Sequence, residues 1–224
     1  MQFSGEGGKM KTRKFMLPGL GLAVVLAAVV SLLFSAGAGA GSDSTKMRWD
    51  IIQLSGTAPN LTVSPGGKAS ADAQNGNRLT ITGTGTFHVG ESDEVSGGGT
   101  WVTTGPDVGT HNGTFKVTRL VSFELAPGSV PTTFIDTVTG VDANFRGGLA
   151  VLRIDYKDGS KGVLVVSCDA PVGGPASQFE GITASKGFVD FWNREAPTGA
   201  SPLVLGTNEN RTQFHVLPGD DDDD

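Results

Sequence analysis

Three charged residues in segments suited to β-strands are the side chains of this sequence with the clearest chemical potential. Arg119 belongs to a segment whose same-parity positions are apolar: Phe115, Val117, Val121 and Phe123. In a second segment Arg153 and Asp155 share their parity with Leu149 and Val151. Successive side chains of a strand alternate between its two faces, so we expect all three charges to point into the fold.

A buried charge costs free energy unless a partner faces it, and we therefore expect a pair between Arg119 and Asp155. If this pair lines a cavity, then Arg119, Arg153 and Asp155 form a ligand-binding site. If the pair lies at one end of the fold and is partly solvated, its role is structural. The sequence names no catalytic residue beside these three candidates.

Other residue types that often carry chemistry lack the required spacing. His88, His111 and His215 are the only histidines, and none stands in a zinc-binding pattern. There is no G-x-S-x-G nucleophile elbow and no G-x-x-x-x-G-K-[ST] phosphate loop. The single cysteine, Cys168, is expected to be a buried apolar group at a strand end. We predict no metal and no cofactor, and we favour a non-catalytic protein over an enzyme.

The segments that must position these residues are short, β-branched and separated by glycine-rich turns, and none has the pattern of an amphipathic helix. Tight-turn sequences such as Asn75-Gly76-Asn77 connect them. Eight strands are predicted, over Met47–Leu54, Lys68–Ala73, Arg78–Val89, Val95–Thr104, Asn112–Phe123, Gly148–Tyr156, Gly162–Cys168 and Phe179–Trp192.

A Gly-Thr-aromatic motif recurs three times at a spacing of about 14 residues, the length of one strand and one turn. Its copies are Gly85-Thr86-Phe87, Gly99-Thr100-Trp101 and Gly113-Thr114-Phe115. We therefore predict three successive strands of an antiparallel meander, with the aromatic rings on one inner face. The glycines are expected where the sheet bends.

These patterns predict an all-β fold. Residues 78–89 alternate strictly between Thr-rich and apolar positions, which indicates a sheet with one dry face. We favour an antiparallel meander that closes into a roughly eight-stranded barrel, because closure removes exposed edges. A two-layer β-sandwich is the alternative.

The stretch from Leu79 to Phe87, LTITGTGTF, resembles the Gly-x-Gly-x-Phe strand of the dirigent and allene oxide cyclase barrels. This resemblance implies an eight-stranded barrel that guides or catalyses cyclisation and coupling of hydrophobic ligands. It covers this one strand. The acidic and arginine residues that line the cavities of those families have no matching motif here, so the resemblance carries over no catalytic residue.

An apolar run from Phe15 to Phe34 follows a basic cluster and precedes the sequence Ala38-Gly39-Ala40. These are the three parts of a secretory signal, and the run is also long enough to span a bilayer. Residues 1–40 are therefore a cleaved signal peptide or an uncleaved membrane anchor. In either case the body lies outside the cytoplasm, secreted or membrane-anchored.

The body divides into a linker (residues 41–46), a β-domain (47–196) and a Pro/Gly-rich tail (197–224) that ends in Asp220–Asp224. One more strand is conceivable within the tail, over Arg211–Leu217. The 24-residue connection Glu124–Gly147 is long for a compact domain and is interpreted either as a lid or as a plug.

Charge limits the possible partners. Residues 41–224 hold 13 basic and 22 acidic side chains, and no basic segment with interleaved aromatic residues is present. We therefore expect no nucleic acid partner, and membrane contact only through the N-terminal segment. The predicted function is an exported, non-catalytic barrel that binds a small apolar ligand or a surface partner. A cofactor-free cyclase or isomerase and a purely structural extracellular domain are the alternatives, and the oligomeric state stays open.

Overall fold

Residues that alternate between apolar and polar side chains form the strands of one sheet in the computed structural model. It describes residues 44–57, 60–127, 134–140, 144–169, 175–197 and 208–218. All of them belong to one compact unit, Asp43–Asp224. The predicted leader and the acidic terminus lie outside the described residues. No helix in the described ranges is long and apolar enough to cross a membrane.

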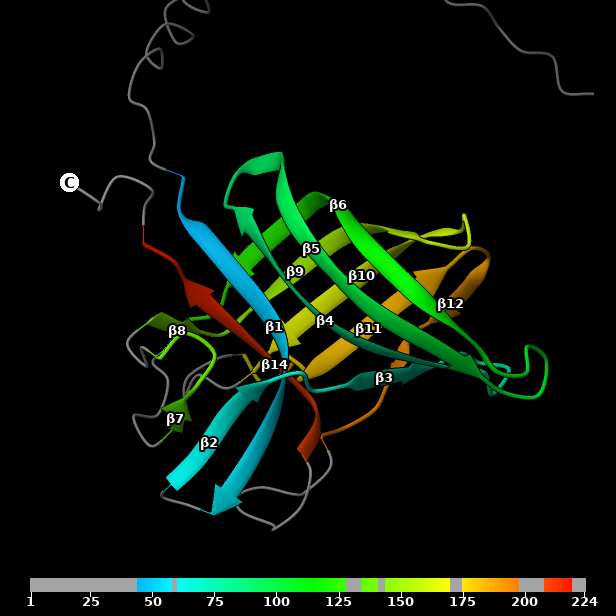
Figure 1. Cartoon of the computed structure of the whole chain (residues 1–224), viewed down its shortest axis with the longest axis horizontal. Coiled ribbons are helices and arrows are strands. Elements are labelled where there is room, and N and C mark those ends of the chain that lie inside the picture. Colours follow the sequence, from blue (N-terminus) through cyan, green and yellow to red (C-terminus); the bar gives the residue numbers. More distant parts are fainter. Residues whose placement is uncertain are drawn as a thin grey trace, which may run out of the picture. The chain divides into compact units, whose positions relative to one another are not determined.

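All eight predicted segments are strands, and the last one is a hairpin of two (Figure 1). The strands are β1 (Lys46–Thr57), β2 (Asn60–Pro65), β3 (Ala69–Asp72), β4 (Arg78–His88), β5 (Glu91–Thr104), β6 (His111–Leu125), β7 (Phe134–Asp136), β8 (Phe145–Arg146), β9 (Gly148–Tyr156), β10 (Lys161–Cys168), β11 (Gly181–Lys186), β12 (Val189–Phe191), β13 (Asn193–Arg194) and β14 (Asn208–Val216). Hydrogen-bonded neighbours follow the order β12-β11-β10-β9-β6-β5-β4-β1-β14-β8.

The all-β prediction is confirmed, but the sheet is not closed into a barrel. The hydrogen-bonded path runs from β12 to β8 without returning. The segment that would have to close the barrel is split between two partners. Its first strand, β12, pairs with β11, whereas its second, β13, pairs with β3. The sheet is also mixed, since β2 and β7 run parallel. It is a single curled sheet, in which β4, β5 and β6 cross over β9, β10 and β11 (Figure 1).

The curled sheet buries its inner face in one continuous apolar cluster. The cluster draws side chains from strands across the whole path, from β12 at one end to β14 near the other. Its largest members without measurable exposure are Trp49, Phe87, Leu79, Ile81, Leu152, Leu164, Ile182 and Phe214. Apolar side chains thus fill the inner space of the curl.

The predicted meander is confirmed. β4, β5 and β6 are consecutive antiparallel neighbours, and Phe87, Trp101 and Phe115 all lie in the core cluster. Two glycines of β4, Gly85 of the motif and Gly83 before it, have a function beyond bending. A Cβ atom on Gly85 would lie 2.7 Å from the indole nitrogen of Trp49, and one on Gly83 would lie 3.0 Å from the same ring. These glycines make room for the Trp49 side chain against the inner face.

The strand β14 lies within the segment that we assigned to the tail. It pairs with β1 along most of its length, from Met47 opposite Val216 to Leu54 opposite Asn208. The sheet therefore extends beyond residue 196, where we placed the end of the domain. The further strand that we considered conceivable over Arg211–Leu217 is confirmed, and it begins earlier, at Asn208.

The long connection Glu124–Gly147 contributes two short strands. β7 pairs with β2, and β8 pairs with β14. Phe134 packs on a second apolar cluster formed by Ile52, Leu54 and Val63, whereas Phe145 joins the main core. The described part of the connection therefore packs along β1, β2 and β14.

We expect Phe87→Ala to lower the free energy of unfolding by roughly 3–5 kcal/mol, because it leaves a cavity in the core. Phe188→Ala removes the same ring from a fully exposed position and should change stability little. Urea denaturation of both variants checks this difference. Equal losses in the two variants would contradict the assigned inner face.

Candidate functional site

The structure places Arg119 on the outer face of the sheet, and our expectation of an inward side chain is wrong. The pairing of β6 with β9 shifts register between Val117 and Arg119. This irregularity reverses the parity of the strand, so that Val117 and Leu120 are buried while Arg119 is exposed. The Arg119 guanidinium forms an ion pair with Asp93, with 2.9 Å between the nitrogen and oxygen atoms.

Arg153 and Asp155 also face outward, because the even-numbered side chains of β9 fill the core. Arg153 is exposed and stands in register with Arg119. Asp155 is half-buried and lies in register between Lys116 of β6 and Lys161 of β10. The three predicted residues thus share one outer surface and line no interior cavity, and the expected Arg119–Asp155 pair does not form.

A pocket of about 460 Å³ opens on the rim of the curled sheet. It arises because β9 ends at Tyr156, opposite Phe115, while β6 continues outward as far as His111 with β5 as its paired neighbour. The hairpin of β11 and β12 borders the other side of this gap. Turn residues 107–108 and Asp158 complete the lining.

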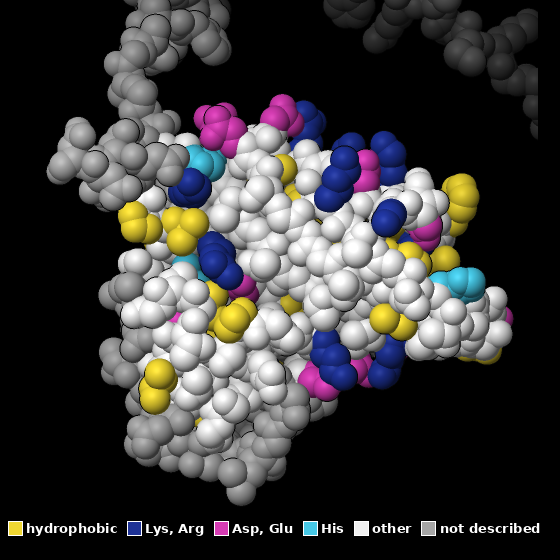
Figure 2. All heavy atoms as spheres, viewed as in Figure 1, with side chains coloured by type: hydrophobic (Ala, Val, Ile, Leu, Met, Phe, Trp, Pro, Cys, Tyr) yellow, Lys and Arg dark blue, Asp and Glu magenta, His cyan; other side chains and the backbone are white. Residues whose placement is uncertain are grey.

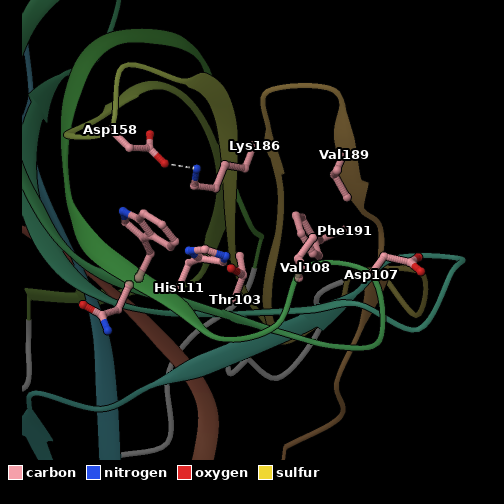
Figure 3. A pocket seen from close by; sticks show the side chains of 10 residues that line it. Thr103, Asp107, Val108, His111, Asp158, Lys186, Val189 and Phe191 are labelled. Atoms are coloured by element: carbon pink, nitrogen blue, oxygen red, sulfur yellow. Dashed lines mark hydrogen bonds and ion pairs between the residues drawn. The ribbon is translucent and has the colours of Figure 1, made fainter.

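The two sides of the rim pocket differ in chemistry. Figure 3 shows Val108, Val189 and Phe191 on one side of the pocket, together with Asp107, and Thr103, His111 and Lys186 on the other. Trp101 is a further lining residue. Asn112 also lines the pocket. An apolar surface opposite hydrogen-bonding groups is typical of sites for small amphipathic molecules.

Lys186 is held in place at this pocket. Its ammonium group lies 4.2 Å from the centre of the Trp101 ring and 4.9 Å from that of Tyr156. It also forms an ion pair with Asp158 (Figure 3) and donates a hydrogen bond to the Ser160 hydroxyl oxygen at 2.9 Å. The slight burial of Asp158 raises its pKa, but hydrogen bonds from Lys186 and Ser160 outweigh this and lower the pKa to about 2. The Lys186 side chain is therefore fixed in position at the pocket, beside the Asp158 carboxylate.

Other pocket groups are available to a ligand. The side chains of Thr103, His111 and Asn112 make no hydrogen bond within the ranges that the structure describes, and His111 and Asn112 are exposed. No nucleophile stands in hydrogen-bond contact with a base among these described side chains. The arrangement can bind and orient a molecule, and it offers no built catalytic pair.

A buried polar cluster lies on the opposite face of β1 and β14 from the core, and sequence reasoning missed it. His215 Nε2 is 2.6 Å from an Asp136 carboxylate oxygen and 2.7 Å from the Gln213 amide nitrogen. Burial raises the pKa of Asp136, yet hydrogen bonds from the Val138 amide and His215 lower it below its usual value. His215 has no exposed surface. Because Asp136 belongs to β7 and His215 to β14, the hydrogen bond between them connects β7 to the sheet.

The alternation of Arg211, Gln213 and His215 was the one signal for this cluster in the sequence. It marks a polar strand face but names no partner for it. Asp136 lies in the long connection, where no periodicity indicates burial. Among the residues described, no group of three or more His, Cys, Asp or Glu side chains is arranged to hold a metal ion.

Glu180 is a second buried titratable group without a sequence signal. Its carboxylate accepts hydrogen bonds from the Thr212 amide at 2.6 Å and the Asp169 amide at 2.9 Å. Burial raises the pKa of Glu180 to about 8, and the Asp169 side chain adds to the effect. Glu180 therefore connects β14 to the turn between β10 and β11 while keeping its proton at neutral pH.

We expect the free energy of unfolding to fall as pH rises from about 4.5 towards 8, by up to about 1.4 kcal/mol per pH unit. The folded protein keeps the Glu180 proton over this range, whereas the unfolded chain loses it. The contribution of Glu180 to the free energy of unfolding is therefore complete below the pKa of Glu180 in the unfolded chain, and it is lost as the pH rises towards the pKa in the folded protein. Glu180→Gln should flatten this slope, and the exposed-site control Glu124→Gln should keep it. Urea denaturation at several pH values measures both, and an unchanged slope in Glu180→Gln would refute the assignment.

Comparison with known proteins identifies no relative. No family model, no curated protein and no solved structure matches the chain. The resemblance of the Leu79–Phe87 strand to the dirigent and allene oxide cyclase barrels stays a prediction. The function must therefore be inferred from the geometry of the domain.

Proposed function

We propose that this chain is an exported, non-catalytic binding domain whose ligand site is the rim pocket. The observation that carries this proposal is that the apolar side chains Val108, Val189 and Phe191 line the same pocket as Thr103, His111 and Asn112, whose side chains make no hydrogen bond within the described ranges. Such a lining selects a small molecule with one apolar face and one polar face. The volume of about 460 Å³ suits a ligand of this kind.

The rim is favoured over the interior because the inner face of the sheet is occupied by its own side chains. Leu152, Ile154 and Leu164 in the middle strands have at most 1% exposure. A ligand within the curl would have to displace this core. Our predicted apolar ligand therefore binds at the rim, where Lys186 and His111 add polar contacts.

The pocket lies towards the opposite end of β4 from the point where the described chain enters the domain. The chain enters the domain at Lys46, which stands opposite His88 at one end of β4. Trp101 and Thr103 of the pocket stand opposite Ile81 and Leu79, towards the other end of that strand.

A cofactor-free cyclase or isomerase is not favoured. That alternative depended on Arg119, Arg153 and Asp155 as cavity residues, and these lie on the outer face. Nothing about the rim pocket requires a covalent step.

The proposal is tested with 1-anilinonaphthalene-8-sulfonate, an amphipathic aromatic anion whose fluorescence rises in apolar sites. We expect saturable binding at one site. Val108→Phe fills the pocket and should weaken binding at least about tenfold, because it removes the volume that the apolar ring needs. Val102→Phe makes the same change on β5 outside the pocket lining and is the matched control.

Two results would contradict the rim site. One is unchanged dye binding by Val108→Phe with the fold intact by circular dichroism. The other is an equal loss in Val102→Phe, which would indicate a general effect on the sheet.

A further inference from the structure

Basic side chains from three neighbouring strands gather on the outer face of β6, β9 and β10. Register places Lys116, Asp155 and Lys161 in one row across the strands, and Arg119 and Arg153 in the next. In-register side chains of a sheet point to the same side, so these groups share one surface. Lys157 follows at the end of β9, where its amide bonds to the Thr114 carbonyl at 2.8 Å.

This basic face, defined as Lys116, Arg119, Arg153, Lys157 and Lys161, is exposed at all five positions. Dark-blue Lys and Arg side chains gather along the upper right of the molecule in Figure 2. These five cations lie on one face, although acidic side chains outnumber basic ones in residues 41–224 by 22 to 13.

The charges of the basic face are balanced in one row and unbalanced in the next: Asp155 lies in register between Lys116 and Lys161, whereas no acidic side chain separates Arg119 from Arg153. Arg119 and Arg153 stand directly opposite each other, and like charges in register destabilise a sheet. The Arg119 ion pair with Asp93 offsets little of this cost, because 75% of the Asp93 side chain is exposed and an exposed pair is weak. Repulsion of this kind is relieved when an anionic surface covers the face.

An apolar tip stands beside the basic face. Phe188 is fully exposed in the two-residue turn between β11 and β12, whose first residue, Gly187, has a φ of 59°. The Gly187 amide donates a hydrogen bond to the Lys161 carbonyl at 2.9 Å, so the tip adjoins the end of the basic face. The ion pair of Lys186 with Asp158 holds the hairpin in place.

We propose that the basic face and Phe188 together dock on an anionic lipid bilayer. The cations attract the lipid head groups, while Phe188 enters the interface between head groups and acyl chains. An anionic polymer would use the cations alone and would leave the exposed aromatic ring without a role. This contact is separate from the N-terminal segment, through which alone we expected membrane contact.

The test is co-sedimentation with vesicles, and the protein used comprises residues 43–224. These residues contain every described strand and both apolar clusters. Removing residues 1–42 eliminates binding by the leader. We expect binding to phosphatidylcholine vesicles with a quarter phosphatidylglycerol, weakening as salt is added, and much weaker binding to pure phosphatidylcholine. Replacing Lys116, Arg119, Arg153 and Lys161 together by Gln should reduce affinity at least about a hundredfold, since each cation contributes about fivefold.

Phe188→Ser should reduce affinity about tenfold, because it removes the ring that enters the interface. Matched controls are Lys68→Gln with Arg194→Gln, which remove charge elsewhere, and Ile135→Ser, an exposed apolar residue of β7. Circular dichroism verifies that each variant is folded.

Three outcomes would overturn the proposal. The first is equal binding to neutral and anionic vesicles, and the second is equal loss in the control variants. The third is binding to heparin with the same dependence on the four cations while Phe188→Ser leaves vesicle binding unchanged. That last result would assign the face to anionic polymers instead of lipid.

Discussion

The packing of Trp49 against a glycine-lined stretch of β4 is the contact on which the rest of the structure depends. A Cβ atom at Gly85 would lie 2.2 Å from the Ser96 carbonyl oxygen as well as 2.7 Å from the Trp49 ring, so neither the strand pairing nor the ring tolerates a larger residue. Without side chains at these positions, β4 and β5 approach closely and the sheet curls around a large indole. A single sheet can then bury its own inner face, although no second sheet and no helix covers it in the described part.

This way of forming a core decides where binding is possible. The inner face is occupied by packed apolar side chains, and for this reason we propose binding at the rim and on the outer surface. The rim pocket exists because β6 extends beyond the end of β9. The basic face exists because outward-facing residues of three strands lie in register. Both features meet at the hairpin of β11 and β12, where Val189 lines the pocket and Phe188 forms the exposed tip. The two proposed contact surfaces therefore share this hairpin.

Local patterns in the sequence predicted the strands and the meander, because alternation and repeat spacing are properties of neighbouring residues. The inward orientation of Arg119 was predicted wrongly because one shift of register between Val117 and Arg119 reverses a face and leaves no mark in the sequence. That of Arg153 and Asp155 was predicted wrongly because both faces of β9 carry apolar side chains and the even-numbered ones are buried. Long-range pairings were equally hidden. The burial of His215 depends on Asp136, and that of Glu180 depends on packing against Thr212. The rim pocket joins β5 and β6 to β11 and β12, which no spacing in the sequence relates.

The central claim is that ligands bind at the rim while the interior stays closed. The most direct measurement is a two-dimensional ¹⁵N and methyl NMR titration of residues 43–224 with a library of small amphipathic fragments. Binding should shift the indole signal of Trp101, the amides of His111 and Asn112, and the methyl groups of Val189. The methyl groups of Leu152, Ile154 and Leu164 should stay unchanged. Shifts concentrated on those interior methyl groups, with the rim unaffected, would contradict the account.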